Sequence, residues 1–183
     1  MFPLVSTVAE FERAGAALVD VAAEEGIDLA GLEVGVMIEV PSAALGAARL
    51  AARADFLSIG TNDLLQYLLA ADRLNAAVAG LADVYEPDAL ALVGQIIDAG
   101  HAHGTRVGLC GEAASDPLLA AALVGLGIDE LSMASVAIPE VRDVLSRLEL
   151  RQCEDAVRHA LERGTDGAGV RRLLEEHLHL DDR

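Results

Sequence analysis

Short apolar runs alternate along the chain with longer segments in which apolar residues recur every three or four positions. The short runs predict five β-strands, at residues 1–5, 34–40, 56–59, 106–110 and 130–133. The longer segments predict helices at residues 8–25, 43–53, 62–70, 87–103, 117–126 and 138–148. Strands that alternate with helices are typical of an α/β fold with a parallel sheet and right-handed crossovers.

Capping and turn residues mark the ends of several predicted helices. Thr61 is expected to cap the helix that follows it, and Pro87 suits the first turn of the next helix. We expect Gly104 to end that helix and residues 115–117 to start another. Residues 72–87 are irregular and are long enough to form an active-site loop.

The last part of the chain differs from the rest because it contains helical patterns without strands. Helices are predicted at residues 153–163 and 170–180, with a flexible break at residues 164–169. We therefore divide the chain into an α/β domain at residues 1–148 and a helical segment at residues 149–183. Five βα units fit either an open doubly wound sheet or the last five units of a TIM-type (β/α)8 barrel, and no glycine-rich phosphate fingerprint is present.

The composition of the chain excludes some classes of binding partner. The chain is 53% hydrophobic and carries a net charge of −17, with no lysine, which argues against binding a nucleic-acid backbone or an anionic membrane. A small anionic substrate is still compatible with this charge, because one arginine and a metal ion can reverse the field in a cleft. No long apolar stretch predicts a membrane span, no basic leader is evident, and Cys110 and Cys153 lack zinc-site spacing, so we expect a cytoplasmic, reduced protein.

Three predicted strands end in polar or reactive residues, in the segments VMIEVP (36–41), SIGTND (58–63) and GLCGE (108–112). In α/β barrels the chemistry lies at the carboxyl ends of the parallel strands. If these strands are neighbours, their side chains converge, and the combination of carboxylates with a thiol suggests a divalent metal ion and a proton donor.

Each candidate residue has a structural interpretation beside the functional one. Glu39 and Asp63 could bind Mg²⁺ through carboxylate oxygens, or could cap the helices that follow them. Arg73 could bind a phosphate or carboxylate, or could pair with Asp72 at the surface. Cys110 could act as a general acid or a nucleophile, or could be a small buried apolar side chain.

Four longer segments, three of which contain these strand ends, are specific enough to indicate a protein family. GVMIEVPSAAL, DFLSIGTNDLLQYLLAADR, GLCGEAASDP and DELSMASVAIPEVR, in this order, resemble the C-terminal part of Enzyme I of the bacterial sugar phosphotransferase system, the phosphoenolpyruvate (PEP)–protein phosphotransferases. The opening MFPLVSTVAE is also similar, and the resemblance covers residues 1–148. Pyruvate phosphate dikinase and PEP synthase share the barrel of this family, but their motifs are less similar.

The resemblance implies a (β/α)8 barrel that binds PEP and Mg²⁺ and forms a homodimer. It implies that Glu39 and Asp63 are magnesium ligands, that Asn62 and Asp63 contact the substrate phosphate, and that Arg73 contacts the substrate. It also implies that Cys110 donates a proton to the methylene carbon, which releases pyruvate. The phosphoryl acceptor of the family is a histidine on a separate upstream domain, which passes the phosphoryl group to a phosphocarrier protein.

The chain begins at what resembles the fourth strand of that barrel, and the acceptor domain has no counterpart in it. We therefore expect a fragment, a split subunit or a truncated paralogue. The main hypothesis is the PEP- and Mg²⁺-binding region of an Enzyme I. The alternatives are a non-catalytic binding or assembly module, and a PEP-binding domain of the dikinase or synthase type.

Overall fold

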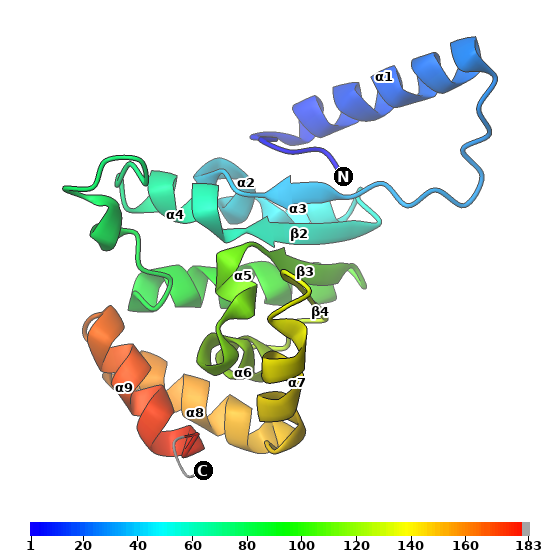
Figure 1. Ribbon diagram of the computed structural model, residues 1–183. Coiled ribbons are helices and arrows are strands. Elements are labelled where there is room, and N and C mark those ends of the chain that lie inside the picture. Colours follow the sequence, from blue (N-terminus) through cyan, green and yellow to red (C-terminus); the bar gives the residue numbers. More distant parts are fainter. Residues whose placement is uncertain (181–183) are drawn as a thin grey trace.

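The computed structural model describes residues 1–180 (Figure 1). Its strands are β1 (Val36–Ile38), β2 (Phe56–Gly60), β3 (Arg106–Cys110) and β4 (Glu130–Ser132). Its helices are α1 (Val8–Glu25), α2 (Pro41–Leu45), α3 (Ala47–Ala51), α4 (Thr61–Leu68), α5 (Pro87–His101), α6 (Pro117–Gly125), α7 (Ile138–Ser146), α8 (Leu150–Arg163) and α9 (Gly167–Leu178), with short 3-10 turns η1 (Ala79–Leu81) and η2 (Glu112–Ser115).

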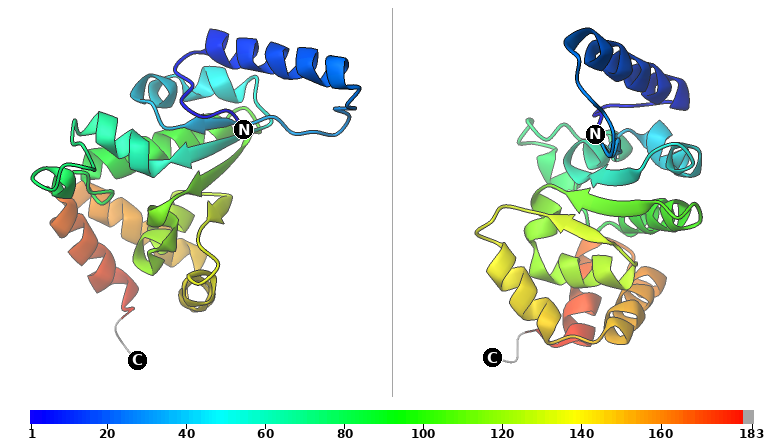
Figure 2. Two further views of the ribbon diagram at one scale, coloured as in Figure 1. Left: turned by 45° about the horizontal axis from the view of Figure 1, so that its top comes forward. Right: turned by 90° about the vertical axis from the view of Figure 1, so that its right-hand side faces the viewer.

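The four strands form one parallel sheet in the order β1-β2-β3-β4, which confirms the predicted α/β class. Each crossover therefore advances by one strand in the same direction. Right-handed crossovers of this kind place the connecting helices on the same face of the sheet. Figures 1 and 2 show α3 and α5 on that face.

The two faces of the sheet differ in chemistry. The helix-covered face is apolar and buried, and its neighbours in register are Val36, Leu57 and Val107 in one row and Ile38, Ile59 and Leu109 in the next. Apart from Met37, the opposite face carries small or polar residues. One row is Met37, Ser58, Gly108 and Glu130, and the next is Gly60, Cys110 and Ser132. A central parallel sheet normally has apolar residues on both faces. This sheet differs, because polar side chains lie on the face opposite the covering helices.

Two of the elements predicted before residue 54 are wrong. Residues 1–5 do not form a strand, because only Phe2 pairs with the sheet, through an isolated bridge to Val36, and Leu4 turns away with a φ of 51°. The helix predicted at residues 43–53 is instead split into α2 and α3 at Gly46. Gly46 has a ψ of 10°, outside the helical range, and glycine is a weak helix former in this position.

The C-terminal helices begin earlier than predicted. α8 starts at Leu150, and α9 starts inside the expected flexible break, where the Asp166 side chain accepts a hydrogen bond from the amide of Gly169. α8 and α9 pack on one another, and both contact α6. The end of the predicted helical segment, residues 181–183, lies outside the described residues.

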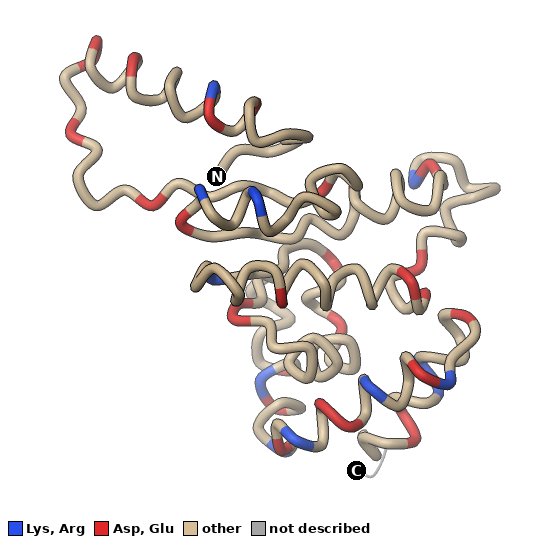
Figure 3. Tube along the Cα trace, turned by 180° about the vertical axis from the view of Figure 1, so that it is seen from behind, with Lys and Arg blue, Asp and Glu red and all other residues tan. Residues whose placement is uncertain are grey.

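Figure 3 shows acidic residues along most of the chain and arginines mainly on α7, α8 and α9. Three of the arginines in this region pair with a carboxylate three or four positions away, in Arg147–Asp143, Arg158–Asp155 and Arg172–Glu176. Such pairing compensates part of the positive charge of these helices, whereas binding to a phosphate backbone needs a basic surface. Within residues 1–180, every helix is too short or too polar to traverse a lipid bilayer.

Candidate active site

The carboxyl ends of β1, β2 and β3 lie side by side, as the strand order requires. Glu39 follows β1 directly, Asn62 and Asp63 stand in the first turn of α4 immediately after β2, and Cys110 is the last residue of β3. Because Gly60 pairs in register with Cys110, the ends of β2 and β3 are level with each other. The three predicted segments thus meet at the carboxyl end of the sheet, which we call the sheet edge.

Glu39 is buried at the carboxyl end of β1. It is only 4% exposed, and its Oε1 accepts a hydrogen bond of 2.7 Å from the backbone amide of Leu4. Its Oε2 lies against Gly60, where an added Cβ would come within 3.0 Å of that oxygen. A buried carboxylate with a single backbone donor is costly to desolvate unless another positive group is near, which is a reason to expect a cation here.

Asp63 and Arg73 form the only ion pair seen among the predicted residues in the described part of the chain, with 3.5 Å between Arg73 Nη2 and Asp63 Oδ1. Arg73 is further placed by a hydrogen bond of 3.3 Å from its backbone amide to Gln66 Oε1. The predicted surface pair with Asp72 is not formed. Both side chains of the Asp63–Arg73 pair are partly exposed, so the pair adds little to stability and can exchange for a ligand.

A cleft of about 400 Å³ opens beside this pair. One wall is residues 69–86, the irregular connection from α4 to α5 that we call the cleft segment, and the other wall is formed by α4 and η2. The lining residues are Asn62, Leu65, Arg73, Leu74, Ala79, Ala82 and Glu112. The cleft therefore unites two of the three predicted substrate residues, Asn62 and Arg73, whereas Asp63, Glu39 and Cys110 do not line it.

Cys110 lies on the small, polar face of the sheet. Its thiol donates a hydrogen bond of 3.6 Å to the carbonyl oxygen of Ile59 on β2. Gly60 on one side and Gly111 on the other leave it half-exposed. The second cysteine, Cys153, is buried in α8, and burial raises the pKa of its thiol, as expected for a packing residue.

Thr61 departs from its predicted role. It is the first residue of α4 rather than its N-cap, and Gly60 takes the capping position without a side-chain hydrogen bond. Thr61 is 1% exposed, and its hydroxyl is the one buried side-chain polar atom among residues 1–180 that lacks a hydrogen-bond partner. Native proteins rarely leave such a group unpaired, so this hydroxyl marks the strand ends as a place where a ligand oxygen or water would be stabilised.

Gly111 sits against Thr61 with a φ of 111°, a backbone conformation that favours glycine. A Cβ on Gly111 would lie 3.3 Å from the Thr61 hydroxyl and 3.6 Å from Asn62 Oδ1. The turn after Cys110 therefore runs directly over the start of α4. In the sequence, the glycine directly after Cys110 is the sign of this close approach. Nothing in the sequence distinguishes the unpaired Thr61 hydroxyl from an ordinary helix cap.

The site offers carboxylates from two strands, a thiol from a third and an arginine beside a cleft. Among the described residues, no three histidine, cysteine or acidic side chains are close enough to hold a metal ion by themselves. Any cation would therefore be shared with ligand oxygens. This arrangement suits a small anion with an oxygen-bound cation better than a structural metal centre.

Comparison with known families gives one consistent match. The model of a family described as "PEP-utilising enzyme, PEP-binding domain" matches residues 1–150. Phosphoenolpyruvate-protein phosphotransferases of Latilactobacillus sakei and of Lactococcus lactis subsp. lactis are each 41% identical to the chain, over 183 and 181 residues. Both alignments cover 97% of this chain and 32% of the relative.

The protein of the same name from Geobacillus stearothermophilus is 43% identical over 169 residues, which is 90% of this chain and 29% of the relative. The chain thus spans about a third of the length of the curated relatives it matches. The alignments with the first two relatives also include the helices after residue 150, beyond the end of the family model.

Proposed function

The chain belongs to the family of PEP-utilising enzymes, as a PEP-binding domain, and on that premise we propose that it forms the PEP-binding region of a PEP–protein phosphotransferase. In this proposal the phosphoryl group of PEP passes to a histidine on a separate domain, and pyruvate is released. A phosphocarrier protein would then receive the phosphoryl group from that histidine.

One observation carries this proposal: the side chains expected to handle PEP follow three adjacent parallel strands at the same sheet edge. Barrel enzymes place their chemistry at this edge. The sheet also supports a barrel rather than a doubly wound arrangement, since its order never reverses. We accordingly propose residues 1–148 as part of a (β/α)8 barrel and residues 149–183 as a helical segment beside it.

The donor set fits Mg²⁺. Glu39 and Asp63 supply hard carboxylate oxygens, and Mg²⁺ is commonly held by one or two carboxylates together with waters and substrate phosphate oxygens. The buried state of Glu39 is consistent with this, because a nearby cation would offset the cost of desolvating its charge. When bound, the ion would neutralise negative charge on the phosphoryl and enol oxygens.

The chain's own residues would hold PEP between the cleft, which Asn62 and Arg73 line, and the adjoining strand ends, where Glu39 and Cys110 lie. Asn62, in the first turn of α4, would donate from its side-chain amide to a phosphate oxygen. Arg73 would exchange part of its pair with Asp63 for a phosphate or carboxylate oxygen, which a guanidinium binds with two parallel N–H groups. The unpaired Thr61 hydroxyl could donate to an oxygen that reaches the strand ends.

Cys110 would complete the reaction. As the bond between phosphorus and the bridging oxygen breaks, the electron pair remains on the oxygen, and the phosphoryl group moves to the histidine nitrogen. The enolate carbon then takes the thiol proton, which leaves pyruvate and a thiolate. The hydrogen bond to the Ile59 carbonyl holds the thiol at the strand end until that step.

Three further features belong to the proposal. We propose that the protein forms a homodimer, which would cover apolar surface such as Val19 and Val21 on α1. We propose a cytoplasmic location, where PEP and the carrier protein would be available. We also expect no nucleic-acid or membrane partner, on the basis of the net charge of −17.

Calorimetric titration of the chain with PEP, with and without Mg²⁺, tests the proposal. We expect saturable binding that requires Mg²⁺ and that weakens at least about tenfold in Asp63→Asn, since a charge-assisted contact is lost. Glu33→Gln is a matched control, because Glu33 is an exposed carboxylate paired with Arg106 at the opposite end of the sheet. A folded chain that fails to bind PEP would instead favour a non-catalytic assembly module.

A further inference from the structure

The helical segment contacts the cleft segment at its far end. The backbone amide of Gly167, the first residue of α9, donates a 3.1 Å hydrogen bond to Glu86 Oε1. Gly167 also packs tightly on Asp83, since an added Cβ would fall 2.4 Å from Asp83 Oδ2. The start of α9 thus seats directly on residues 83–86, the last part of the cleft segment before α5.

Tyr85 connects this contact to the other wall of the cleft. The side chain is 3% exposed, and its hydroxyl donates a 2.8 Å hydrogen bond to Asp116 Oδ2. Burial, reinforced by the hydrogen bond to Asp116, raises the pKa of Tyr85, so the hydroxyl keeps its proton and remains a donor. Asp116 in turn caps α6 through Leu118 and closes η2, the turn that begins with Glu112.

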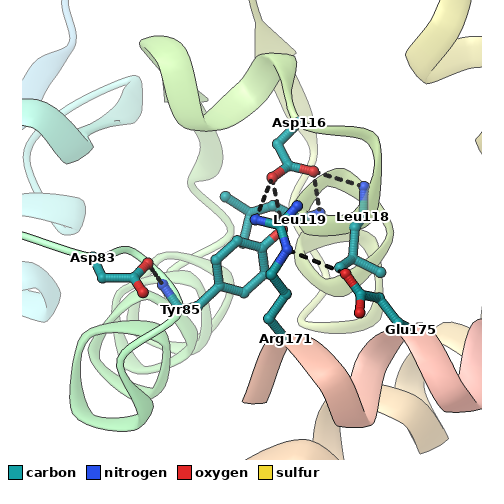
Figure 4. Close-up of polar contacts among 7 residues, drawn as sticks. All are labelled: Asp83, Tyr85, Asp116, Leu118, Leu119, Arg171 and Glu175. Carbon is teal, nitrogen blue, oxygen red and sulfur yellow. Dashed lines mark hydrogen bonds and ion pairs between the residues drawn. The ribbon is translucent and has the colours of Figure 1, made fainter. Parts of the chain in front are cut away.

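Arg171 covers this junction from α9 (Figure 4). Its guanidinium carbon lies 4.9 Å from the centre of the Tyr85 ring, within the range of a cation–π contact. Its Nη1 is 3.7 Å from Asp116 Oδ2, and its Nε donates to Glu175 Oε1 at 3.2 Å. The Glu175 contact holds the guanidinium over the ring. One side chain of α9 thus touches both Tyr85 of the cleft segment and Asp116, the residue that directly follows η2.

We propose that Arg171 is a positioning residue for the cleft: by clamping Tyr85 to Asp116, it fixes the spacing between the cleft segment, which carries Arg73, and the turn that carries Glu112. Arg171 does not line the cleft and would act on it through its contacts with Tyr85 and Asp116. The effect on substrate affinity rests on the function proposed above. The effect on the order of the cleft segment does not.

A simpler account is that Arg171 only forms surface ion pairs, which contribute little when half-exposed. Arg172 separates the two accounts. It is the next residue on α9, it also pairs with a glutamate one turn away, at 3.8 Å from Glu176, and it contacts neither Tyr85 nor Asp116 in the described structure. A surface-pair role predicts the same result for Arg171→Gln and Arg172→Gln, whereas a positioning role predicts different results.

Hydrogen–deuterium exchange of the whole chain is the first measurement. We expect amides of residues 79–86 to exchange faster by a factor of about 3 to 10 in Arg171→Gln, as loss of a cation–π contact would allow, with α8 unchanged. Arg172→Gln should match the wild type. Tyr85→Phe, which keeps the ring but loses the hydroxyl, should loosen the same amides. Unchanged exchange at residues 79–86 in Arg171→Gln would overturn the proposal.

Titration with PEP and Mg²⁺ is the second measurement. We expect Arg171→Gln to weaken PEP binding by a similar factor while the melting temperature stays within the range seen for Arg172→Gln. A loosened cleft segment with wild-type affinity would overturn the positioning role. If the wild-type chain does not bind PEP, the function proposed above fails, and the exchange comparison alone decides whether Arg171 orders the cleft segment.

Discussion

The backbone amide of Leu4 donates a 2.7 Å hydrogen bond to Oε1 of Glu39, across 35 positions of the chain. The residues before α1 are therefore tied to a side chain that we propose as a magnesium ligand. Phe2 strengthens the attachment through its bridge to Val36. The residues that the sequence suggested as a strand thus serve to hold a buried carboxylate in place.

Replacement of Glu39 should separate its two roles. Glu39→Gln keeps an oxygen that can accept the Leu4 hydrogen bond, so we expect unfolding free energy to change by less than about 1 kcal/mol while Mg²⁺-dependent PEP binding falls at least about tenfold. Glu39→Ala leaves the Leu4 amide unpaired and should cost a further ~1 to 3 kcal/mol. Urea denaturation and calorimetry measure the two effects. Equal PEP affinity in Glu39→Gln and wild type would remove Glu39 from the proposed metal site.

Cys110 should matter for turnover rather than for binding. We expect Cys110→Ala to bind PEP within about twofold of wild type. In a complete phosphotransferase that carries this region, the same change should slow pyruvate formation by about 100-fold or more, since a positioned general acid contributes that much. Cys153→Ala is the control, and it should lower stability through lost packing in α8 without slowing turnover. Loss of PEP binding in Cys110→Ala would contradict the assigned role.

Thr61→Val tests whether the unpaired hydroxyl serves a ligand. Removing a buried hydroxyl that has no partner should leave the free chain as stable as before, or more stable by about 1 kcal/mol, while PEP binding weakens severalfold. Thr105→Val provides the contrast, because Thr105 is also buried but its hydroxyl donates a 2.8 Å hydrogen bond to the carbonyl oxygen of Ala51. That variant should lose ~1 to 3 kcal/mol and keep its affinity. Thermal melts with and without PEP distinguish the two patterns.

Asp129 should give the stability a dependence on acid pH. Burial alone would raise its pKa, but the hydrogen bond from the Val107 amide and the 2.9 Å contact with His101 outweigh it, so the pKa is lowered on folding. A carboxyl with a lowered folded pKa contributes stability above its unfolded pKa of about 3.9, and this contribution is lost as pH falls through the folded value.

We therefore expect Asp129→Asn to be less stable than wild type at pH 7, and the difference to shrink as pH falls below about 4. Urea denaturation at several pH values measures it. Asp20→Asn, a change at an exposed carboxylate on α1, is the control and should show no such convergence. A difference in stability that stays constant below pH 4 would mean that the charge of Asp129 does not contribute, and that only its hydrogen bonds do.

The alternation of strands and helices could be predicted from local patterns, because each strand is an apolar run and each helix repeats its apolar positions every turn. The split of α2 from α3 could not, since Gly46 interrupts a segment whose apolar spacing remains helical. The start of α9 at Gly167 was missed for the opposite reason. A glycine at this position suggests the end of a helix, but in the structure Gly167 begins α9 and allows the Asp83 carboxylate to approach the backbone closely.

The sequence was sufficient to predict that the candidate residues lie at the carboxyl ends of neighbouring strands. Strand-end residues converge whenever parallel strands are neighbours, so the placement of Glu39, Asp63 and Cys110 near one another follows from the pattern. Their orientations do not follow. The sequence contains no sign that Glu39 faces Gly60 rather than the cleft, or that Arg171 reaches Tyr85 across 86 positions, because such contacts depend on how helices pack in three dimensions.

Gly60 has a consequence for the interpretation of variant screens. A Cβ there would lie 3.0 Å from Glu39 Oε2 and 3.1 Å from the Met37 sulfur, so alanine would already require these side chains to shift slightly. Larger residues would displace them further, and we expect selection to disfavour such replacements. A survival assay would score the position as essential without revealing whether folding or chemistry had failed. Only paired measurements of abundance and specific activity on the same variants would tell a misfolded protein from a well-folded one whose buried carboxylate has been displaced.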